Sequence, residues 1–302
     1  MKKIVQFIKK NKIGTVKENI KISTLTTYKV GGNCKIVVYP KDTDKLILLL
    51  KYLKEENIKY KVIGYGSNLI FSDDEFDGVL IRLDSFNDVK IKDTIITAGS
   101  GVSLVKLSYR ALKEGLTGLE FASGIPGTVG GAVFMNAGAY KSDMGYIVSE
   151  VKVLTPDLKI KKLYNKDMKF KYRTSFLKEN TEYICLEAKM VLMHGDKKAI
   201  KELIETRRQK RLLSQPLEYP SAGSVFRNPD NDFAGRLIEE CGLKGRQIGG
   251  AKVSKKHANF IVNKNNASAK DIKDLIELVH DKVQKETNVD LKIEQEFVNW
   301  EN

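Results

Sequence analysis

The segment Gly118–Tyr140, GLEFASGIPGTVGGAVFMNAGAY, constrains the fold of this chain most, because its composition is opposite to that of its surroundings. Charged residues make up 30% of the 302-residue chain, yet this segment carries only one, Glu120, together with six of the 23 glycines. Glycine lets the backbone approach another group closely and adopt positive φ angles without a Cβ clash. The segment is therefore expected to be covered by something that contacts its main chain.

Two interpretations of this segment remain open at this point. Consecutive backbone N–H groups can form a concave site for an anion such as a nucleotide diphosphate. Alternatively, the small residues serve only a tight crossing of two parts of the chain. A second run favours the first interpretation, because a predicted apolar strand ends in Gly64-Tyr65-Gly66-Ser67-Asn68 and presents amides and hydroxyls at its tip. Neither run fits the GxGxxG or GxxxxGK[ST] fingerprints.

These two runs and four further segments, in the same order, resemble the UDP-N-acetylenolpyruvoylglucosamine reductases, flavoenzymes of peptidoglycan precursor synthesis. The matching segments are TTYKVGG at 26–32, IGYGSNL at 63–69, SGIPGTVGGAVFMNAGAY at 123–140, YRTS at 172–175, PSAGSVFRNP at 220–229 and GRLIEECGLKG at 235–245. The family has a type with an extra tyrosine-bearing loop over the substrate. The short run between Arg173 and Tyr183 favours the type without that loop.

The resemblance implies an α+β fold, with a two-lobed FAD-binding domain of the vanillyl-alcohol-oxidase (PCMH) type and a smaller α/β substrate-binding domain. The implied boundaries are 1–84 for the first lobe, 85–213 for the second and 214–302 for the substrate domain. A final strand at about 289–300 is expected to return to the FAD domain.

Local patterns predict several elements independently of the resemblance. Asp42 and Asp196 are expected to cap helices, a capping box at Ser268–Asp271 to open a long one, and 89–98 to form a hairpin. Residues 1–22 read as a short helix followed by a linker. Strands are expected within 221–228, at 258–263 and at 289–300.

The resemblance also implies the cofactors and the reaction. FAD is expected to bind non-covalently and NADPH to donate the hydride, so that the enolpyruvyl ether UDP-N-acetyl-3-O-(1-carboxyvinyl)glucosamine is reduced to UDP-N-acetylmuramate. The three histidines lie outside the glycine-rich runs, which argues against a covalent histidyl link. The residues expected to bind FAD are Tyr28, Gly64, Tyr65, Gly66, Ser67, Asn68, Leu69, Ser123, Gly124, Ile125, Pro126, Gly127, Thr128, Gly130, Gly131 and Ala132.

Three side chains are assigned catalytic roles by the resemblance. Ser224 would protonate C2 of the enolpyruvyl group, Arg173 would face its carboxylate, and Glu294 would be the catalytic glutamate. From the sequence alone Ser224 is a hydroxyl among small residues, since no GxSxG elbow surrounds it. Substrate contacts are expected from Asn136, Tyr172, Arg173, Asn228 and Glu294, with Lys210, Arg227 and Arg236 as further candidates for its phosphates.

The choice of the catalytic glutamate stays open between Glu294 and Glu296. In the family an apolar residue follows this glutamate and an arginine comes next, whereas this chain reads Glu294-Gln295-Glu296. Counting from Ser224 without a gap selects Glu294. Glu296 lies two residues on, and therefore on the same face of a strand.

Composition limits the remaining possibilities. The net charge of +14 comes from dispersed lysines without interleaved aromatics, so we expect no nucleic-acid partner. The three cysteines are widely separated and match no CxxC spacing, which indicates a reducing compartment and gives no metal-ligand pattern. The lack of a signal peptide or of an apolar run of about 18 residues predicts a cytoplasmic protein without membrane contact. We also expect a monomer. A sugar or alcohol flavin oxidase and a basic nucleic-acid-binding protein remain as alternatives.

Overall fold

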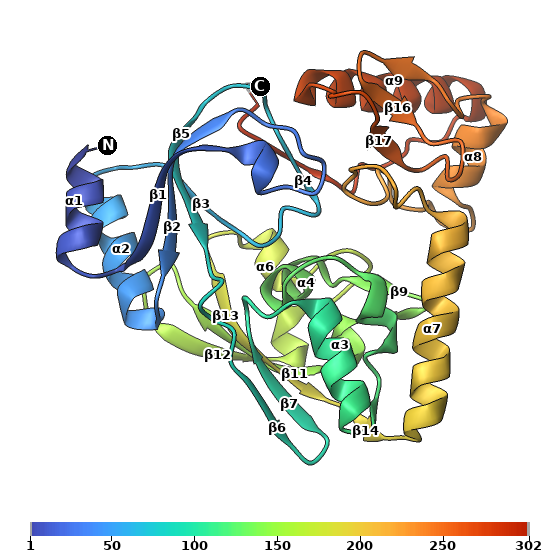
Figure 1. The fold of residues 1–302 in the computed structure, drawn as a ribbon. Helices are drawn as coiled ribbons and strands as arrows, with labels where there is room; N and C mark the ends of the chain where they lie inside the picture. The colour runs from blue at the N-terminus through green and yellow to red at the C-terminus, as the bar shows by residue number, and fades with distance from the viewer. Residues whose placement is uncertain (1, 301–302) are drawn as a thin grey trace. The chain divides into compact units, whose positions relative to one another are not determined.

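The structure is a computed structural model that describes residues 2–300, and it divides into two compact units (Figure 1). The first unit contains the chain up to Glu18, Ile36–Tyr65 and Gly78–Gln209. The second contains Asn19–Lys35, Gly66–Asp77 and the chain from Lys210 onward. Each has a hydrophobic core of its own, and the first unit has two.

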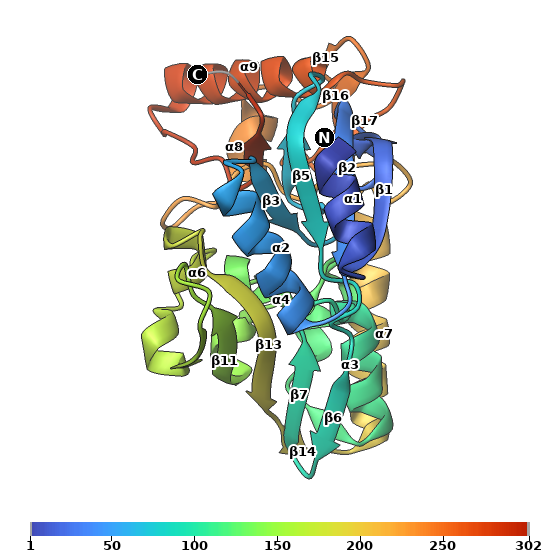
Figure 2. The same ribbon diagram turned by 90° about the vertical axis from the view of Figure 1, so that its left-hand side faces the viewer.

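One core of the first unit lies between a sheet of order β1-β2-β5-β3 and two helices. Figures 1 and 2 show both helices on the same face of this sheet. The second helix forms where predicted, because the Asp42 carboxylate accepts a hydrogen bond from Lys45 N and four leucines form its buried stripe. The elements are α1 (Lys2–Lys10), β1 (Gly14–Lys21), β2 (Asn33–Pro40), α2 (Thr43–Glu55), β3 (Tyr60–Ile63) and β5 (Phe76–Arg82).

The other core of the first unit lies against a five-stranded antiparallel sheet of order β12-β11-β13-β7-β6. The predicted hairpin is confirmed as β6–β7, and it turns at Asp93 with φ of 53°. The strands are β6 (Val89–Lys92), β7 (Ile95–Gly99), β11 (Val148–Leu154), β12 (Ile160–Tyr164) and β13 (Ile184–Val191), with short pairs β8 (Leu116–Thr117) with β14 (Met193–His194) and β9 (Gly138–Ala139) with β10 (Ser142–Asp143).

Several short helices belong to the same unit as this second sheet. They are α3 (Leu104–Lys113), η2 (Glu120–Gly124), α4 (Val129–Met135), α5 (Met144–Ile147), η3 (Asn165–Met168) and α6 (Phe176–Glu179). Two of them, η2 and α4, lie within the glycine-rich segment Gly118–Tyr140. The connection from Arg173 to β13 consists of α6 and turns, so it holds no inserted loop. The long helix α7 (Lys197–Ser214) is capped at Asp196 as predicted, since Ala199 N donates to its carboxylate.

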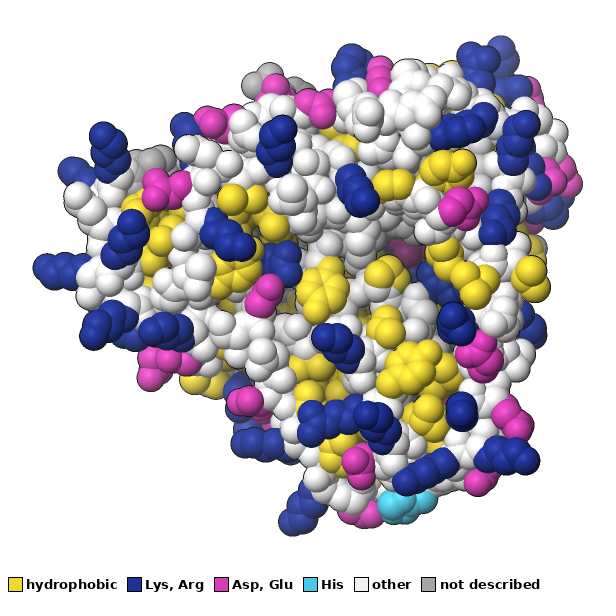
Figure 3. Space-filling view, in the orientation of Figure 1, with side chains coloured by type: hydrophobic (Ala, Val, Ile, Leu, Met, Phe, Trp, Pro, Cys, Tyr) yellow, Lys and Arg dark blue, Asp and Glu magenta, His cyan; other side chains and the backbone are white. Residues whose placement is uncertain are grey.

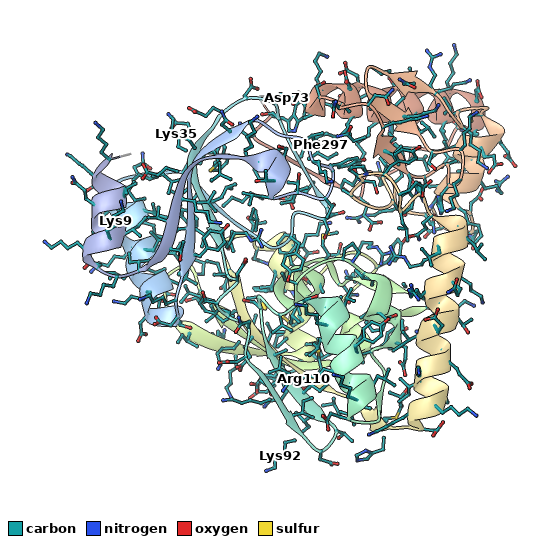
Figure 4. The ribbon with its side chains drawn as sticks, in the orientation of Figure 1. Lys9, Lys35, Asp73, Lys92, Arg110 and Phe297 are labelled. Carbon is teal, nitrogen blue, oxygen red and sulfur yellow. The ribbon has the colours of Figure 1, made fainter. Side chains whose placement is uncertain are left out.

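The second unit is built around α9 (Ala269–Thr287), whose predicted capping box at Ser268 and Asp271 is present. Asp73, labelled in Figure 4, also caps this helix: Ala269 N and Lys270 N donate to its two carboxylate oxygens at 2.8 and 3.0 Å. The other elements are η1 (Ile22–Thr24), β4 (Leu69–Phe71), α8 (Ala234–Glu240), β15 (Gln247–Ile248), β16 (Ala251–Val253), β17 (Ile261–Asn263) and β18 (Glu296–Val298).

The structure differs from the predicted elements at both ends of the chain. Residues 14–21 form strand β1 instead of a linker. The predicted final strand is reduced to β18, which pairs in parallel with β4, and the strand expected within 221–228 is a single bridge between Phe226 and Ile293. Both differences arise from pairing with residues far away in the sequence, which no local pattern reveals.

The units also divide the chain differently from the expected three segments, whose boundaries remain a prediction. Residues 19–35 and 66–77, inside the expected first FAD lobe, belong to the second unit. Tyr28, Val30 and Ile70 lie in its core, and β4 is the partner of β18.

The distribution of surface charge and the hydropathy of the helices are relevant to the predicted absence of nucleic-acid and membrane partners. Figure 3 shows lysine and arginine side chains scattered over the visible face with acidic side chains among them. Between residues 2 and 300, no helix combines the length and the hydropathy that a membrane span requires.

Candidate active site

The two glycine-rich runs meet inside the first unit, at Gly64 and Thr128. Gly64 directly follows the strand β3, and Thr128 precedes α4. A Cβ atom on Gly64 would lie only 2.7 Å from Thr128 Oγ1. Glycine is therefore needed at position 64 so that the two runs can approach each other.

Hydrogen bonds hold the start of α4 in place while leaving part of it open. Leu104 N donates to Gly127 O at 3.0 Å, Val129 N to Val102 O at 2.8 Å and Gly130 N to Ser100 O at 2.9 Å. The Thr128 hydroxyl caps the helix by accepting from Gly131 N at 3.3 Å. Within residues 2–300 the amides of Gly127 and Thr128 form no hydrogen bond, so two neighbouring donors remain available to an anion.

A buried hydroxyl at the same place also lacks a partner. Ser100 is 3% exposed, and its Oγ makes no hydrogen bond to any described residue. It lies beside Gly130, whose added Cβ would meet Ser100 Cβ at 2.9 Å. A cavity of about 290 Å³ in the same unit is lined by Tyr65, Gly101 and Ser103 among others, but not by Ser100 itself. A buried hydroxyl without a partner, together with two open amides, fits a phosphate-bearing cofactor such as FAD.

We expect Gly64→Ala to lower FAD retention at least tenfold, because its methyl group would push the Thr128 cap away from the β3 tip. Gly235→Ala is the matched control, since a Cβ there meets its nearest atom, His257 Cε1, at 3.4 Å, an ordinary contact. Equilibrium dialysis of FAD against the apoproteins measures the effect. Equal FAD affinity in both variants would place the cofactor elsewhere.

Arg173 lies in a tight turn of the first unit. Lys171 and Thr174 exchange two backbone hydrogen bonds of 3.0 Å across it. Arg173 itself has φ of 55°, and its guanidinium lies 5.0 Å from the centre of the half-exposed Tyr172 ring. A non-glycine residue with positive φ is uncommon and often marks a functional turn.

Asn136, which was expected to touch the substrate, instead holds this turn. It is 1% exposed, its Nδ2 donates to Lys171 O at 2.9 Å, and its Oδ1 accepts from Gly145 N at 2.8 Å. Both ends of the amide are thus used by main chain. These contacts favour a role in positioning Arg173 over direct contact with a substrate.

The Ser224 loop lies in the second unit between two other segments. Asn259 fixes one side: Val225 N donates to its main-chain O at 2.9 Å, and its side chain exchanges two hydrogen bonds with the Phe226 main chain. Glu294 N fixes the other side by donating to Val225 O at 2.8 Å. The Ser224 hydroxyl makes no hydrogen bond to the described residues, so its proton is available to a substrate.

The two glutamates differ in their main-chain neighbours. Glu294 is bonded to Val225, next to Ser224, and its carbonyl accepts from Asn68 Nδ2 at 3.1 Å. Glu296 N donates to Asn68 O at 2.9 Å, and Glu296 pairs with Leu69 in β18. The main chain of Glu294 therefore lies beside Val225, the residue after Ser224, whereas the main chain of Glu296 lies beside β4.

The other predicted binding residues are distributed over both units. Ser123–Ala132 lie in the first unit, whereas Gly66–Leu69 lie in the second, where Gly66 has φ of 63° and Thr27 N donates to its carbonyl. Tyr28 is fully buried in the second core. Asn228 is exposed, and its Oδ1 accepts from Ala234 N at the start of α8.

Among the cations considered for the substrate phosphates, Arg236 is already paired. It lies between the carboxylates of Asp232 and Glu240 on α8 and its neighbouring turn. The Arg236 guanidinium, with a backbone hydrogen bond from Phe233, lowers the pKa of Asp232 to about 2.

The three free cysteines, Cys34, Cys185 and Cys241, are all buried. No cluster of three metal-binding side chains occurs within residues 2–300.

His257 and His280 each form hydrogen bonds to neighbouring residues. His257 Nδ1 accepts from Asn259 N, and burial, helped by the Lys244 charge, lowers its pKa, so its imidazole is neutral at neutral pH. His280 lies on α9 between Asp281 and Asp290, at 3.0 and 2.9 Å. Hydrogen bonds to Asp281 and then to Asp290 raise the pKa of His280 above its ordinary value of 6.5.

We expect His280→Gln to destabilise the protein more in acid than in base. Since the folded pKa lies above the unfolded one, the stabilisation is fully present below the unfolded value and is lost as pH rises through the folded value. The fall in Tm should therefore be larger at about pH 5.5 than at about pH 9. Circular dichroism melts measure this, and an equal fall at both pH values would contradict the assignment.

Sequence reasoning missed two residues that organise the second unit, Asn259 and Gln295. Both are polar and buried, at 3% and 4% exposure. The only sequence signal for Asn259 is an amide among apolar residues in HANFIV, and for Gln295 it is the departure from the family's apolar residue.

Family models match both parts of the chain. One described as "FAD binding domain" matches residues 34–164, and one described as "UDP-N-acetylenolpyruvoylglucosamine reductase, C-terminal domain" matches residues 215–298. The chain is 44% identical to the UDP-N-acetylenolpyruvoylglucosamine reductase of Anoxybacillus flavithermus and 42% identical to that of Bacillus subtilis. Each alignment covers 99% of this chain and 99% of the relative.

Solved structures agree with the family models. The crystal structure of the UDP-N-acetylenolpyruvylglucosamine reductase from Thermus caldophilus matches with a TM-score of 0.81 and 32% identity, over 94% of this chain and 99% of that one. The glucose dehydrogenase Phl p 4.0202 matches with a TM-score of 0.50 and 13% identity over 65% of this chain and 44% of its own, which bears on the fold alone. The predicted α+β fold of the vanillyl-alcohol-oxidase type is confirmed.

Proposed function

The chain belongs to the UDP-N-acetylenolpyruvoylglucosamine reductase family and is an oxidoreductase with an FAD-binding domain, and we propose that it reduces the enolpyruvyl ether of UDP-N-acetylglucosamine to UDP-N-acetylmuramate with NADPH as hydride donor. The observation that carries the proposal is the hydrogen bond from Glu294 N to Val225 O. It brings the main chain of Glu294 beside Val225, the residue that follows Ser224, whose hydroxyl makes no hydrogen bond to the described residues. In the proposal this serine and this glutamate handle the proton that reduction of an enol ether requires.

The cofactor site in the proposal follows from the open amides of the first unit. Gly127 N, Thr128 N and Ser100 Oγ would hold the FAD diphosphate, with the tip of β3 at Gly64 closing over them. When bound, FAD would supply the hydride-transfer chemistry between NADPH and the substrate. The protein contributes binding, orientation and the proton.

Each catalytic side chain has a distinct task in the proposal. Arg173 offers a planar guanidinium fork that suits the enolpyruvyl carboxylate and stabilises the enolate-like charge that develops there. Ser224 gives the proton to C2 as hydride reaches C3. Glu294 would relay a proton from solvent back to Ser224 after each turnover. Tyr172 and Asn228 remain proposed substrate contacts.

The setting of the reaction also belongs to the proposal. Three buried free thiols are compatible with a reducing compartment, so we place the enzyme in the cytoplasm, where NADPH and nucleotide sugars are found. We expect it to act as a monomer. The dispersed lysines visible in Figure 3 give a positive field for an anionic substrate rather than a nucleic-acid footprint.

Product analysis tests the proposal. The purified holoenzyme is incubated with the enolpyruvyl ether and either NADPH or NADH, and the nucleotide sugar is examined by mass spectrometry. We expect the product to be heavier by two hydrogens and NADPH to be the better donor. Unchanged substrate, with oxidation of glucose or a simple alcohol instead, would favour a flavin oxidase.

A further inference from the structure

Gln295 lies between the two glutamates, Glu294 and Glu296. It is 4% exposed, so the polar side chain is buried rather than turned to solvent. A buried amide is costly unless its donors and its acceptor are both satisfied. Its contacts therefore show what the amide achieves here.

The amide of Gln295 lies between the Ser224 loop and Tyr28. Its Nε2 is 3.2 Å from Ala222 O, 3.2 Å from Gly223 O and 3.4 Å from Ser224 O. On the other side, the Tyr28 hydroxyl donates to Oε1 at 3.3 Å. The orientation of the amide is determined by these groups, because carbonyl oxygens can only accept and the NH₂ group must face them.

Tyr28 keeps this arrangement intact over the working pH range. It is fully buried, and burial raises the pKa of its hydroxyl well above the ordinary value. The phenol therefore stays neutral and remains a donor. Gln295 Oε1 is held by a group that does not titrate near neutral pH.

Within the loop, the space beside Gly223 is open. Gly223 adopts φ of 78°, and a Cβ built on it would meet nothing within 4 Å. The Gln295 amide, in contrast, contacts the carbonyls of Gly223 and of both its neighbours. An apolar residue at position 295 could fill space but could not bind these carbonyls.

We propose that Gln295 is a positioning residue that holds the Ser224 loop through its carbonyls and so fixes the position of the serine hydroxyl. Its Nε2 donates to the carbonyl of Ser224 itself and to those of the two residues before it. The inference rests on the proposed function, in which Ser224 donates the proton. A misplacement of about 1 Å of such a donor can cost about 10²-fold in rate.

The kinetic test uses Gln295→Leu, which keeps the volume and removes the amide. We expect flavin reoxidation by the enolpyruvyl substrate to slow about 10- to 100-fold, while flavin reduction by NADPH changes less than about twofold. Tyr28→Phe should slow reoxidation less, and the double variant should be no slower than Gln295→Leu alone. Gln247→Leu is the control, because Gln247 is exposed and its Nε2 also donates to a carbonyl, that of Gly249. Unchanged reoxidation in Gln295→Leu, or equal slowing of both steps, overturns the proposal.

A second readout does not depend on turnover or on the bound cofactor. In a Ser224→Cys background the introduced thiol is the only one exposed to a reagent, since Cys34, Cys185 and Cys241 are all buried. We expect adding Gln295→Leu to shift the pH midpoint of alkylation of that thiol, because the loop that carries it is released and the charges around it change. An unshifted midpoint overturns the positioning role. If the unmodified protein does not reduce the enolpyruvyl ether while the midpoint still shifts, the proposed function fails and the positioning role stands.

If Gln295→Leu fails to fold, the inference is decided by Tyr28→Phe, which removes only the hydroxyl that orients the amide. A few-fold slowing of reoxidation that exceeds any change in flavin reduction supports the proposal. Equal rates in Tyr28→Phe and the unmodified protein reject it.

Discussion

Ser224→Ala is expected to slow reoxidation of the reduced flavin by the enolpyruvyl substrate about 10⁴-fold and to leave flavin reduction by NADPH within a few-fold. Hydride transfer from NADPH needs neither the enolpyruvyl group nor its proton donor. Reduction of the enol ether does need a proton at C2. The variant should keep the loop intact, because all of the loop's hydrogen bonds described above use main-chain atoms of residues 222–226.

Stopped-flow absorbance follows the two half-reactions separately. Ser224→Cys restores an acidic proton and should recover part of the lost rate. Equal slowing of both half-reactions in Ser224→Ala would reduce this serine to a structural hydroxyl.

The second large effect concerns the two glutamates. Glu294→Gln is expected to lower the rate of substrate reduction by at least about 10³-fold, and Glu296→Gln by less than about tenfold. The amide keeps the shape of each side chain but removes its charge and its capacity to exchange a proton. Glu294 should matter more because its main chain is bonded to Val225, next to the serine, whereas Glu296 pairs with Leu69.

The same comparison decides which residue is the family's catalytic glutamate. Both variants keep the backbone hydrogen bonds that hold the strand, so each serves as the structural control for the other. If Glu296→Gln proves the more damaging substitution, the ungapped alignment is wrong and the two roles exchange.

Elements with a local cause could be predicted from the sequence. The caps at Asp42, Asp196 and Ser268 form as expected because a side-chain oxygen and the amides three residues on are fixed by the helix itself. The hairpin 89–98 follows for the same reason, since a short turn sets its register.

Elements that depend on distant partners could not be predicted. Residues 14–21 look like a charged linker and become β1 only because β2 lies alongside. The strand expected at 289–300 shortens to three residues because only 296–298 have β4 to pair with. The assignment of residues 19–35 and 66–77 to the second unit has the same origin.

The candidate site shows a similar division. The two glycine-rich runs could be identified because their composition is unusual, and the structure brings Gly64 and Thr128 together. The role of Asn136 could not be predicted, since its partners, Lys171 O and Gly145 N, are 35 and 9 residues away. The role of Gln295 could not be predicted either, since its partners, Tyr28 and the Ser224 loop, lie far from it in the sequence.

The most direct test of the central claim is an anaerobic visible absorption titration of the purified holoenzyme. The account predicts flavin bands corresponding to about one FAD per chain, bleaching of those bands by NADPH, and their return when the enolpyruvyl ether of UDP-N-acetylglucosamine is added. Glucose or a simple alcohol should neither bleach nor restore them. Absence of flavin bands after incubation with FAD, or bands that NADPH bleaches but the enolpyruvyl ether does not restore, would contradict the account.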